Sequence, residues 1–218
     1  MQEVEITGIK RVERKQVLDA LGIPRNASLL AMKVPERARA LEGLPWLRAS
    51  RVRVEFPNRL VVEVTEREPY AVVFAEGFFF MDREGVLFAE AASDAYQSLP
   101  LVTGFSGSGL GIGDRLPQEP LESLRRLMQA LSAVQGWFPM SQVSEFRWHD
   151  EEGFTLYTTV KAIPIELGWD EYELKLGRLQ KVLGHLSHRQ LLDSVTRIDL
   201  DYPNRAFVSG DFPAPKGI

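Results

Sequence analysis

The stretch "LPWLRASRVRVEFPNRLVVEVTEREP" (residues 44–69) predicts two β-strands joined by a tight turn. In its first half, apolar Val52, Val54 and Phe56 alternate with charged residues. In its second half, Leu60, Val62 and Val64 share one face, with Val61, Glu63 and Thr65 on the other. A period of two places each apolar set on one side of a sheet. The Pro-Asn-Arg sequence between the halves is typical of a turn, and a proline at the end stops the second strand. The stretch therefore predicts one complete β-hairpin.

A strand and two short helices are predicted ahead of this hairpin. Residues 3–7 alternate in polarity, as a half-buried strand does. The segment at 12–22 has apolar residues at helical spacing and ends on a glycine, which is typical of a helix C-terminus. The segment at 34–43 has a proline near its start, where a helix tolerates one. The order defines a small β-α-α-β-β domain at residues 1–69.

The rest of the chain, residues 70–218, predicts a larger domain dominated by a β-sheet. Short apolar runs ended by Gly or charged residues predict strands within 71–90, 142–167 and 195–210. Two amphipathic helices interrupt them, at 119–135 and 171–186. Leu174 is assigned to the apolar stripe of the second helix. The predicted fold class is α+β, with both helices packed on the sheet of the larger domain.

The composition excludes several classes of protein. Lys and Arg number 26 against 30 Asp and Glu, and this net charge of −4 argues against nucleic acid as a partner. There are no cysteines, so disulfides, thiolate zinc sites and Cys nucleophiles are excluded. No apolar run reaches the ~18 residues of a membrane-spanning helix, and no signal peptide precedes the first strand. We expect either a cytoplasmic protein or a piece of a longer chain, and the abrupt start favours the second.

Two motifs suggest chemistry, and both are incomplete. The glycine-rich stretch "GSGLGIGD" (residues 107–114) has Asp114 where a dinucleotide fingerprint needs its third glycine, and it lacks the Lys-Ser/Thr end of a P-loop. We interpret it as a flexible connector. His185 and His188 lie near a helix end without an HExxH-type signature. Complementing the negative end of the helix explains this pair more simply than a metal does.

The signatures of a nucleophilic enzyme are also missing. Neither Ser-x-x-Lys nor Gly-x-Ser-x-Gly occurs. Acidic groups at 149–153 and 170–173 fit a hairpin turn and the first turn of a helix. The sequence therefore assigns no catalytic residue, no metal ligand and no cofactor. A hydrolase with a site assembled from distant residues stays open as an alternative.

The cluster "TEREP" (residues 65–69) is a different kind of signal. Arg67 stands between two acids at a strand end, and a proline follows. Such a cluster could fix the angle between two domains by ion pairing and a stiff hinge. It could equally be a plain exposed strand end, and the pattern alone does not separate these two interpretations.

The hairpin and several other segments resemble the signature of the FtsQ/DivIB family of bacterial cell-division proteins. That signature runs Leu-Pro-Trp, an alternating strand, a Pro-bearing turn, a second strand and Glu-Arg-x-Pro-x-Ala. The matching positions are Leu44, Pro45, Trp46, Phe56, Pro57, Leu60, Val64, Glu66, Arg67, Pro69 and Ala71. Further segments match in the same order, at residues 4–23, 78–90, 99–104 and 197–208. The likeness therefore spans essentially the whole chain.

The resemblance implies a polypeptide-transport-associated (POTRA) domain at residues 1–69 and the family's β domain at residues 70–218. It also implies an upstream membrane-spanning helix, absent from this chain, that anchors the fragment on the extracytoplasmic (periplasmic) side of the inner membrane, at the division septum. The family is not enzymatic. It is a divisome scaffold that binds FtsB and FtsL, and other divisome membrane proteins, and helps regulate septal peptidoglycan synthesis. A structural role is implied for the signature residues Trp46, Pro57, Glu66, Arg67 and Pro69.

By resemblance, the partner site is the final hairpin, where a segment of FtsB adds to the sheet. The residues carried over are Ile198, Leu200, Tyr202, Asn204, Arg205, Ala206, Phe207 and Val208. Two positions depart from the family, because Asp201 stands where Arg is usual and Arg205 where Gly is usual. The charge pattern of the partner is therefore expected to differ here.

A last strand suits such a role because its outer backbone donors and acceptors are free. Residues 205–210 contain no Lys and no internal Pro, so a partner segment could pair with them. Tyr202 and Phe207 could serve as aromatic anchors. From the residues alone, a hairpin buried within its own sheet is an equal alternative. A POTRA-bearing outer-membrane assembly or secretion component is another alternative, which the lack of repeats argues against.

Overall fold

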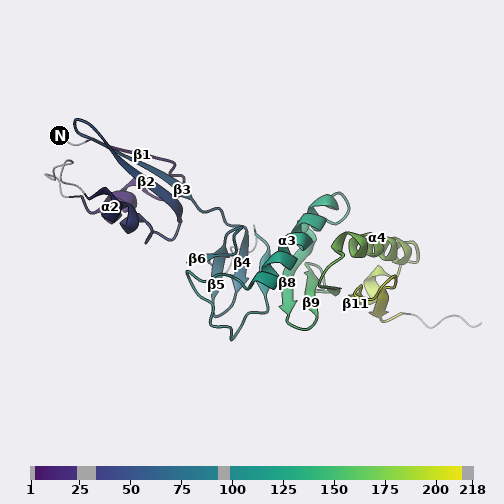
Figure 1. Ribbon diagram of the computed structural model, residues 1–218. Coiled ribbons are helices and arrows are strands. Elements are labelled where there is room, and N and C mark those ends of the chain that lie inside the picture. Colours follow the sequence, from purple (N-terminus) through teal and green to yellow (C-terminus); the bar gives the residue numbers. More distant parts are fainter. Residues whose placement is uncertain (1–2, 24–32, 93–98, 213–218) are drawn as a thin grey trace, which may run out of the picture. The chain divides into compact units, whose positions relative to one another are not determined.

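The computed structural model describes residues 3–23, 33–92 and 99–212. It consists of two compact units, Met1–Pro69 and Tyr70–Ile218 (Figure 1). The tail that closes the larger predicted domain, residues 213–218, lies outside the described residues.

The first unit is a three-stranded sheet with two helices. Its strands are β1 (Glu3–Thr7), β2 (Leu47–Glu55) and β3 (Arg59–Glu66), and its helices are α1 (Arg14–Leu21) and α2 (Val34–Leu41). The sheet order is β1-β3-β2, with β3 parallel to β1 and antiparallel to β2. The β-α-α-β-β prediction is confirmed.

One face of the central strand forms the core of this unit. Leu60, Val62 and Val64 are buried on β3, as the period of two predicts, and they share a cluster with Val17 and Leu21 of α1. The glycine after α1 adopts the left-handed conformation and caps the helix. Local pattern and packing therefore agree on the buried face of β3 and at the end of α1.

The second unit is a nine-stranded sheet with two long helices. Its strands are β4 (Ala71–Phe74), β5 (Phe78–Met81), β6 (Leu87–Glu90), β7 (Leu101–Thr103), β8 (Val143–His149), β9 (Gly153–Thr158), β10 (Pro164–Gly168), β11 (Val195–Asp199) and β12 (Phe207–Gly210). Its helices are α3 (Gln118–Ala133) and α4 (Tyr172–His188), with short 3-10 turns η3 (Met140–Gln142) and η4 (Leu192–Ser194). The sheet order is β12-β11-β10-β9-β8-β7-β4-β5-β6. The α+β prediction is confirmed.

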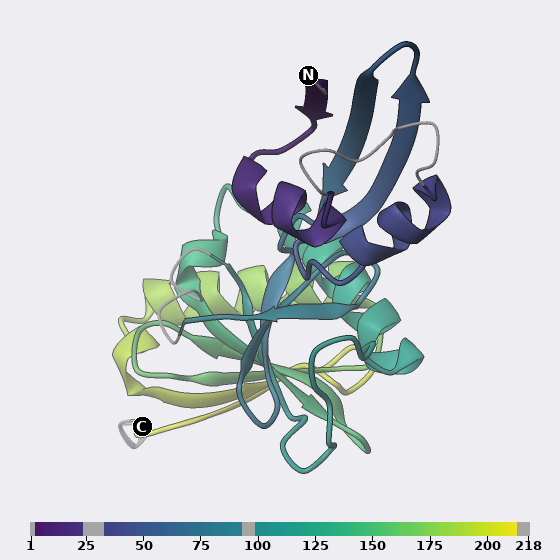
Figure 2. The same ribbon diagram turned by 90° about the vertical axis from the view of Figure 1, so that its left-hand side faces the viewer.

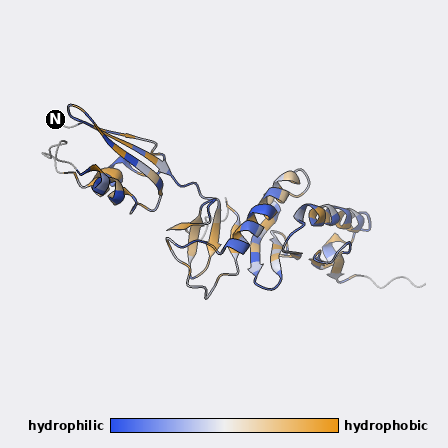
Figure 3. Cartoon of the chain, in the orientation of Figure 1, coloured by the Kyte–Doolittle hydropathy of each residue, from blue (hydrophilic) through white to orange (hydrophobic). Residues whose placement is uncertain are grey.

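Both long helices cover the same face of this sheet (Figures 1 and 2). Leu124 and Leu127 of α3 and Leu176 and Leu179 of α4 are fully buried in one core cluster with the strands. The outward stripes of the helices are hydrophilic (Figure 3). Burial of these two apolar stripes is what holds the helices to the sheet.

Two side chains lie on the wrong side of their predicted elements. Phe56 is 71% exposed, because β2 ends at Glu55 and the turn begins one residue earlier than the alternation suggests. Leu174 is 65% exposed, because it lies outside the buried stripe of α4, which is formed by Tyr172, Lys175, Leu176, Leu179 and Leu186. Both predictions are wrong for the same reason, since periodicity places a stripe but not its margins.

The glycine-rich stretch covers one edge of the nine-stranded sheet. The backbone N–H of Leu87 in β6 donates to the carbonyl oxygen of Asp114 at 2.8 Å, and the N–H of Gly113 donates to the carbonyl oxygen of Leu87 at 2.7 Å. Val86 and Arg115 form a further antiparallel bridge. The stretch interpreted as a flexible connector is therefore bonded to this edge, where it satisfies the outward backbone groups of Leu87, the first residue of β6.

Gly113 is expected to be essential to this cover, whereas Gly111 is not. Gly113 has φ +96°, where a side chain is strained, and Gly111 has open space around its Cα and no positive φ. Gly113→Ala should lower the free energy of unfolding of the second unit by about 1–2 kcal/mol. Gly111→Ala should leave it unchanged or slightly raised, and urea denaturation measures both. Equal effects of the two substitutions would show that the cover is not fixed.

Candidate functional site

The opposite edge of the sheet is the closing hairpin. β12 pairs antiparallel with β11, with Val208 opposite Ile198 and Phe207 opposite Asp199. In the described part of the chain β12 has no second neighbour, so it is an edge strand. Figure 1 shows these yellow C-terminal strands at one end of the unit and β6 at the other.

The predicted partner-binding residues on this hairpin divide into two groups by burial. Ile198 and Leu200 are buried in the core, and Ala206 and Val208 pack against it half-buried. These four side chains support the hairpin from the core side. The buried side chains of Ile198 and Leu200 cannot contact a partner unless the hairpin unfolds.

The other group forms an exposed aromatic pair. Tyr202 is 51% exposed and Phe207 is 49% exposed, and their rings meet edge to face with centroids 4.8 Å apart. Side chains alternate along β12, so Phe207 lies on the sheet face opposite to Val208. A half-exposed aromatic pair beside a free strand edge is the type of surface that anchors a protein partner.

The loop between β11 and β12 brings a cation to the same place. Asn204 has φ +57°, a conformation that Asn tolerates, and the N–H of Arg205 donates to the carbonyl oxygen of Tyr202 at 3.4 Å. The side chain of Arg205 is exposed and has no acidic partner among the described residues. It is therefore free to meet an acid on another molecule.

Two residues of α4 that the sequence analysis missed hold this loop. The ammonium group of Lys175, which is 3% exposed, donates to the carbonyl oxygen of Leu167 at 2.7 Å and to the carboxylate of Asp201 at 2.8 Å. One turn further along, Arg178 donates to the carbonyl oxygens of Tyr202 and Arg205. The sequence does contain a signal for this contact: Lys175 lies on the buried stripe of an amphipathic helix, and a buried charge needs an oppositely charged or hydrogen-bonding partner.

A glycine makes room for the carboxylate of Asp201. Gly168, at the end of β10, has φ +65°, and a Cβ built there would overlap that carboxylate. Asp201 is one of the two departures from the family signature, and its carboxylate has a partner inside this chain. The ion pair that the family's Arg would make with another molecule is therefore not the role of this position here.

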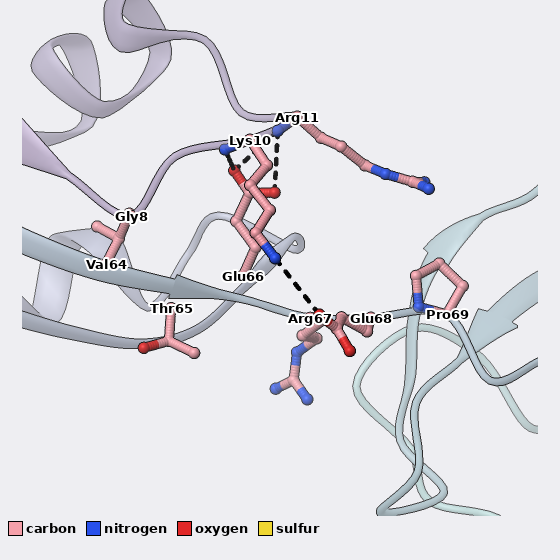
Figure 4. A pocket seen from close by; sticks show the side chains of 9 residues that line it. All are labelled: Gly8, Lys10, Arg11, Val64, Thr65, Glu66, Arg67, Glu68 and Pro69. Atoms are coloured by element: carbon pink, nitrogen blue, oxygen red, sulfur yellow. Dashed lines mark hydrogen bonds and ion pairs between the residues drawn. The ribbon is translucent and has the colours of Figure 1, made fainter.

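Of the signature residues in the first unit, Glu66 has the clearest role. Its carboxylate accepts hydrogen bonds from three successive backbone N–H groups, those of Lys10 at 2.6 Å, Arg11 at 3.0 Å and Val12 at 2.9 Å. The group lies beside a hollow of about 540 Å³ at the end of β3 (Figure 4). Gly8 lets the chain leave β1 here, since a Cβ at this residue would overlap the carbonyl oxygen of Val64.

Burial raises the pKa of the Glu66 carboxyl, but the hydrogen bonds from Lys10, Val12 and Arg11 outweigh it and hold the pKa below its ordinary value. The folded state therefore favours the ionised carboxylate. The ionised carboxylate therefore contributes to the free energy of unfolding above the ordinary pKa of a glutamate. This stabilisation is lost as the pH falls through the lowered pKa of Glu66 in the folded state.

The other signature residues also act within the first unit. The carbonyl oxygen of Trp46 accepts a hydrogen bond from the N–H of Arg67 at 2.8 Å, and the Arg11 guanidinium lies 5.0 Å from the centre of the Trp46 ring. Pro57 forms the turn between β2 and β3, after a cis peptide bond. Pro69 is the last residue of the unit. Both acids of the "TEREP" cluster bond to the segment at 10–12 of the same unit. Glu66 accepts its backbone hydrogen bonds, and Glu68 forms an exposed ion pair with Lys10 at 3.5 Å.

Within residues 3–23, 33–92 and 99–212, no three His, Asp or Glu side chains gather in a way that could hold a metal ion. His185 and His188 lie in the last turn of α4, as expected from the sequence. None of the helices in these ranges is long and apolar enough to cross a membrane.

Comparison with known proteins identifies both units. Residues 1–67 match the family model described as "POTRA domain, FtsQ-type", and residues 71–201 match the model described as "Cell division protein FtsQ/DivIB, C-terminal". The chain belongs to the FtsQ/DivIB family. The second match ends just before the β11–β12 turn, so β12 lies beyond it.

Relatives called cell division protein FtsQ align along most of the chain. The protein from Geobacter sp. (strain M21) is 30% identical over 208 residues, which are 95% of this chain and 75% of that protein. The protein from Syntrophotalea carbinolica is 27% identical over 211 residues, 97% of this chain and 74% of that protein. The protein from Myxococcus fulvus is 29% identical over 204 residues, 91% of this chain and 69% of that protein.

Membership of the FtsQ/DivIB family fixes the general role. Proteins of this family are non-enzymatic scaffold proteins of cell division, found at the membrane of the division site, and they work with other divisome proteins. The sequence-based recognition of the family is confirmed.

Glu66→Ala should lower the free energy of unfolding at neutral pH by about 2 kcal/mol, because it leaves three backbone N–H groups without their acceptor. Glu68→Ala is the matched control and should change it by less than about 0.5 kcal/mol, since its ion pair is exposed. Denaturation at pH 7 and in acid measures both. The loss in Glu66→Ala should shrink as the pH falls through the lowered pKa of Glu66, and a loss that is independent of pH would contradict this role.

Proposed function

We propose that this chain is the extracytoplasmic part of a divisome scaffold that binds FtsB and FtsL, by strand addition at β12, and so helps regulate septal peptidoglycan synthesis. The observation that carries the proposal is the unequal treatment of the two sheet edges in the second unit. The first residue of β6, Leu87, is bonded to the glycine-rich stretch, whereas β12 has no second neighbour among the described residues.

An open edge strand is a hazard unless something pairs with it. Its outward N–H and C=O groups can template aggregation, and proteins usually blunt them with charges, proline or a covering loop. β12 (Phe207–Gly210) contains no charged residue and no proline. Addition of an extended partner segment satisfies these groups and explains why this edge is left open.

The side chains around β12 define the chemistry of that segment. The Tyr202–Phe207 pair favours apolar or aromatic residues on the side of the partner strand that faces away from the helices. The exposed guanidinium of Arg205 favours an acidic residue near the β11–β12 turn. Backbone pairing gives affinity in this scheme, and these side chains give specificity.

The proposal also places the chain at the membrane. An apolar helix upstream of residue 1, with basic residues on its far side, would anchor it with both units outside the cytoplasm. The full reading frame tests this point. A role in outer-membrane assembly or secretion is not favoured, since both family matches are to division proteins. Binding by strand addition requires no reactive group, which agrees with a non-enzymatic role.

Tyr202→Ala and Phe207→Arg should each weaken binding of the extracytoplasmic part of an FtsB/FtsL pair. Truncation of an anchor residue costs ~2 kcal/mol, which corresponds to about a 30-fold rise in Kd. Both side chains are half-exposed, so the cooperative unfolding of the domain should be retained. Isothermal titration calorimetry measures the affinity.

Val160→Arg is the matched control, because Val160 is an apolar residue of the same unit that is 72% exposed at the β9–β10 turn. It should bind like the unaltered chain. Unchanged affinity in both hairpin variants, or an equal loss in the control, would remove the hairpin as the partner site.

A further inference from the structure

Lys175 is the only buried cation in the described part of the chain. It projects from the sheet-facing side of α4, and its ammonium group finds only two oxygen partners there, the carbonyl of Leu167 and the carboxylate of Asp201. Asp201 is itself partly exposed, so the pair lies at the boundary between the core and the β11–β12 loop. A buried ammonium group constrains the position of the loop, because it needs both of these oxygen acceptors to stay in place.

The residues tied by this pair belong to the proposed partner site. Asp201 directly precedes Tyr202, and its N–H donates to the carboxylate of Asp199 at 3.0 Å. Arg178, three residues after Lys175 on α4, donates to the carbonyl oxygens of Tyr202 and Arg205. Lys175 and Arg178 therefore hold both ends of the turn from the same side of one helix.

The loop has little to hold it otherwise. Two backbone–backbone hydrogen bonds are described for residues 200–206. The N–H of Arg205 donates to the carbonyl oxygen of Tyr202 at a long 3.4 Å, and the N–H of Leu200, which precedes the turn, donates to the carbonyl oxygen of Glu166 at 3.0 Å. With the turn in this shape, the ring of Tyr202 meets the ring of Phe207. Side chains of α4 therefore contribute contacts to the shape of the binding surface that the backbone of the hairpin does not supply.

We propose that Lys175 is a positioning residue, which acts through Asp201 to hold the β11–β12 loop in the conformation that a partner strand meets. The inference rests on the proposed function of β12 and names what controls it. A loop that is already ordered loses less conformational entropy when a partner binds. A fixed loop therefore gives higher affinity without any new contact. The pair also assigns an internal role to Asp201.

The experiment compares Lys175→Met, Asp201→Asn and the double variant with the unaltered chain. A buried pair that loses one partner can destabilise the whole domain, whereas loss of both charges together is tolerated better. The double variant therefore separates positioning from folding. Asp193→Asn is the control, since it breaks an exposed ion pair with Lys161 at 2.9 Å in the same unit.

Backbone hydrogen exchange is measured on each free variant, and affinity for FtsB/FtsL by calorimetry. The double variant should exchange about tenfold or more faster at residues 202–207, while β8 and β9 exchange as before. Its affinity should fall about tenfold or more, because the loop must be ordered on binding. Asp193→Asn should change neither quantity.

Two outcomes would overturn the inference. One is a double variant whose loop exchanges and binds as the unaltered chain does. The other is faster exchange spread evenly over the whole unit, which would give the pair a purely structural role. If the unaltered chain fails to bind FtsB/FtsL, the proposed function fails, yet the exchange measurement on free protein still decides whether Lys175 orders the loop.

Discussion

The backbone groups on the outer side of a sheet's two edge strands must be satisfied, and this constraint organises the second unit. At one edge the carbonyl and N–H of Leu87 bond to residues of a glycine-rich stretch, which needs glycines because its backbone turns through left-handed conformations. At the other edge β12 carries no cover within the described residues. The glycine-rich stretch thus bonds to one edge of the sheet, and the other edge stays open among the described residues.

The open edge is presented by a rigid frame. The apolar stripes of α3 and α4 fix the helices to the sheet, and α4 in turn holds the β11–β12 loop through Lys175 and Arg178. Gly168 completes the arrangement, because its missing side chain leaves space for the carboxylate of Asp201. A site for strand addition needs this support, since a short hairpin alone is marginally stable in water.

Much of this architecture follows from local sequence patterns. The alternation at residues 44–69 predicts β2, β3 and the buried face of β3, and the helical stripes predict α3 and α4. Phe56 and Leu174 fail because periodicity does not determine where an element or a stripe ends. β7 escapes prediction because three residues carry no measurable period.

The candidate site is only partly visible in the sequence. The family signature places it on the last hairpin, but residues 205–210 would look the same in a central strand. Only the sheet order shows β12 to be an edge. The roles of Glu66 and Lys175 depend on partners more than 20 residues away in the chain, at positions 10–12 and 201. No local pattern contains such contacts.

Hydrogen exchange along both edges of the sheet, with and without bound FtsB/FtsL, tests the central claim most directly. An added strand takes up outward N–H groups of β12, so residues 207–210 should become strongly protected while β6 stays unchanged. Binding without new protection at 207–210, or with protection at β6 in its place, would contradict strand addition at this edge.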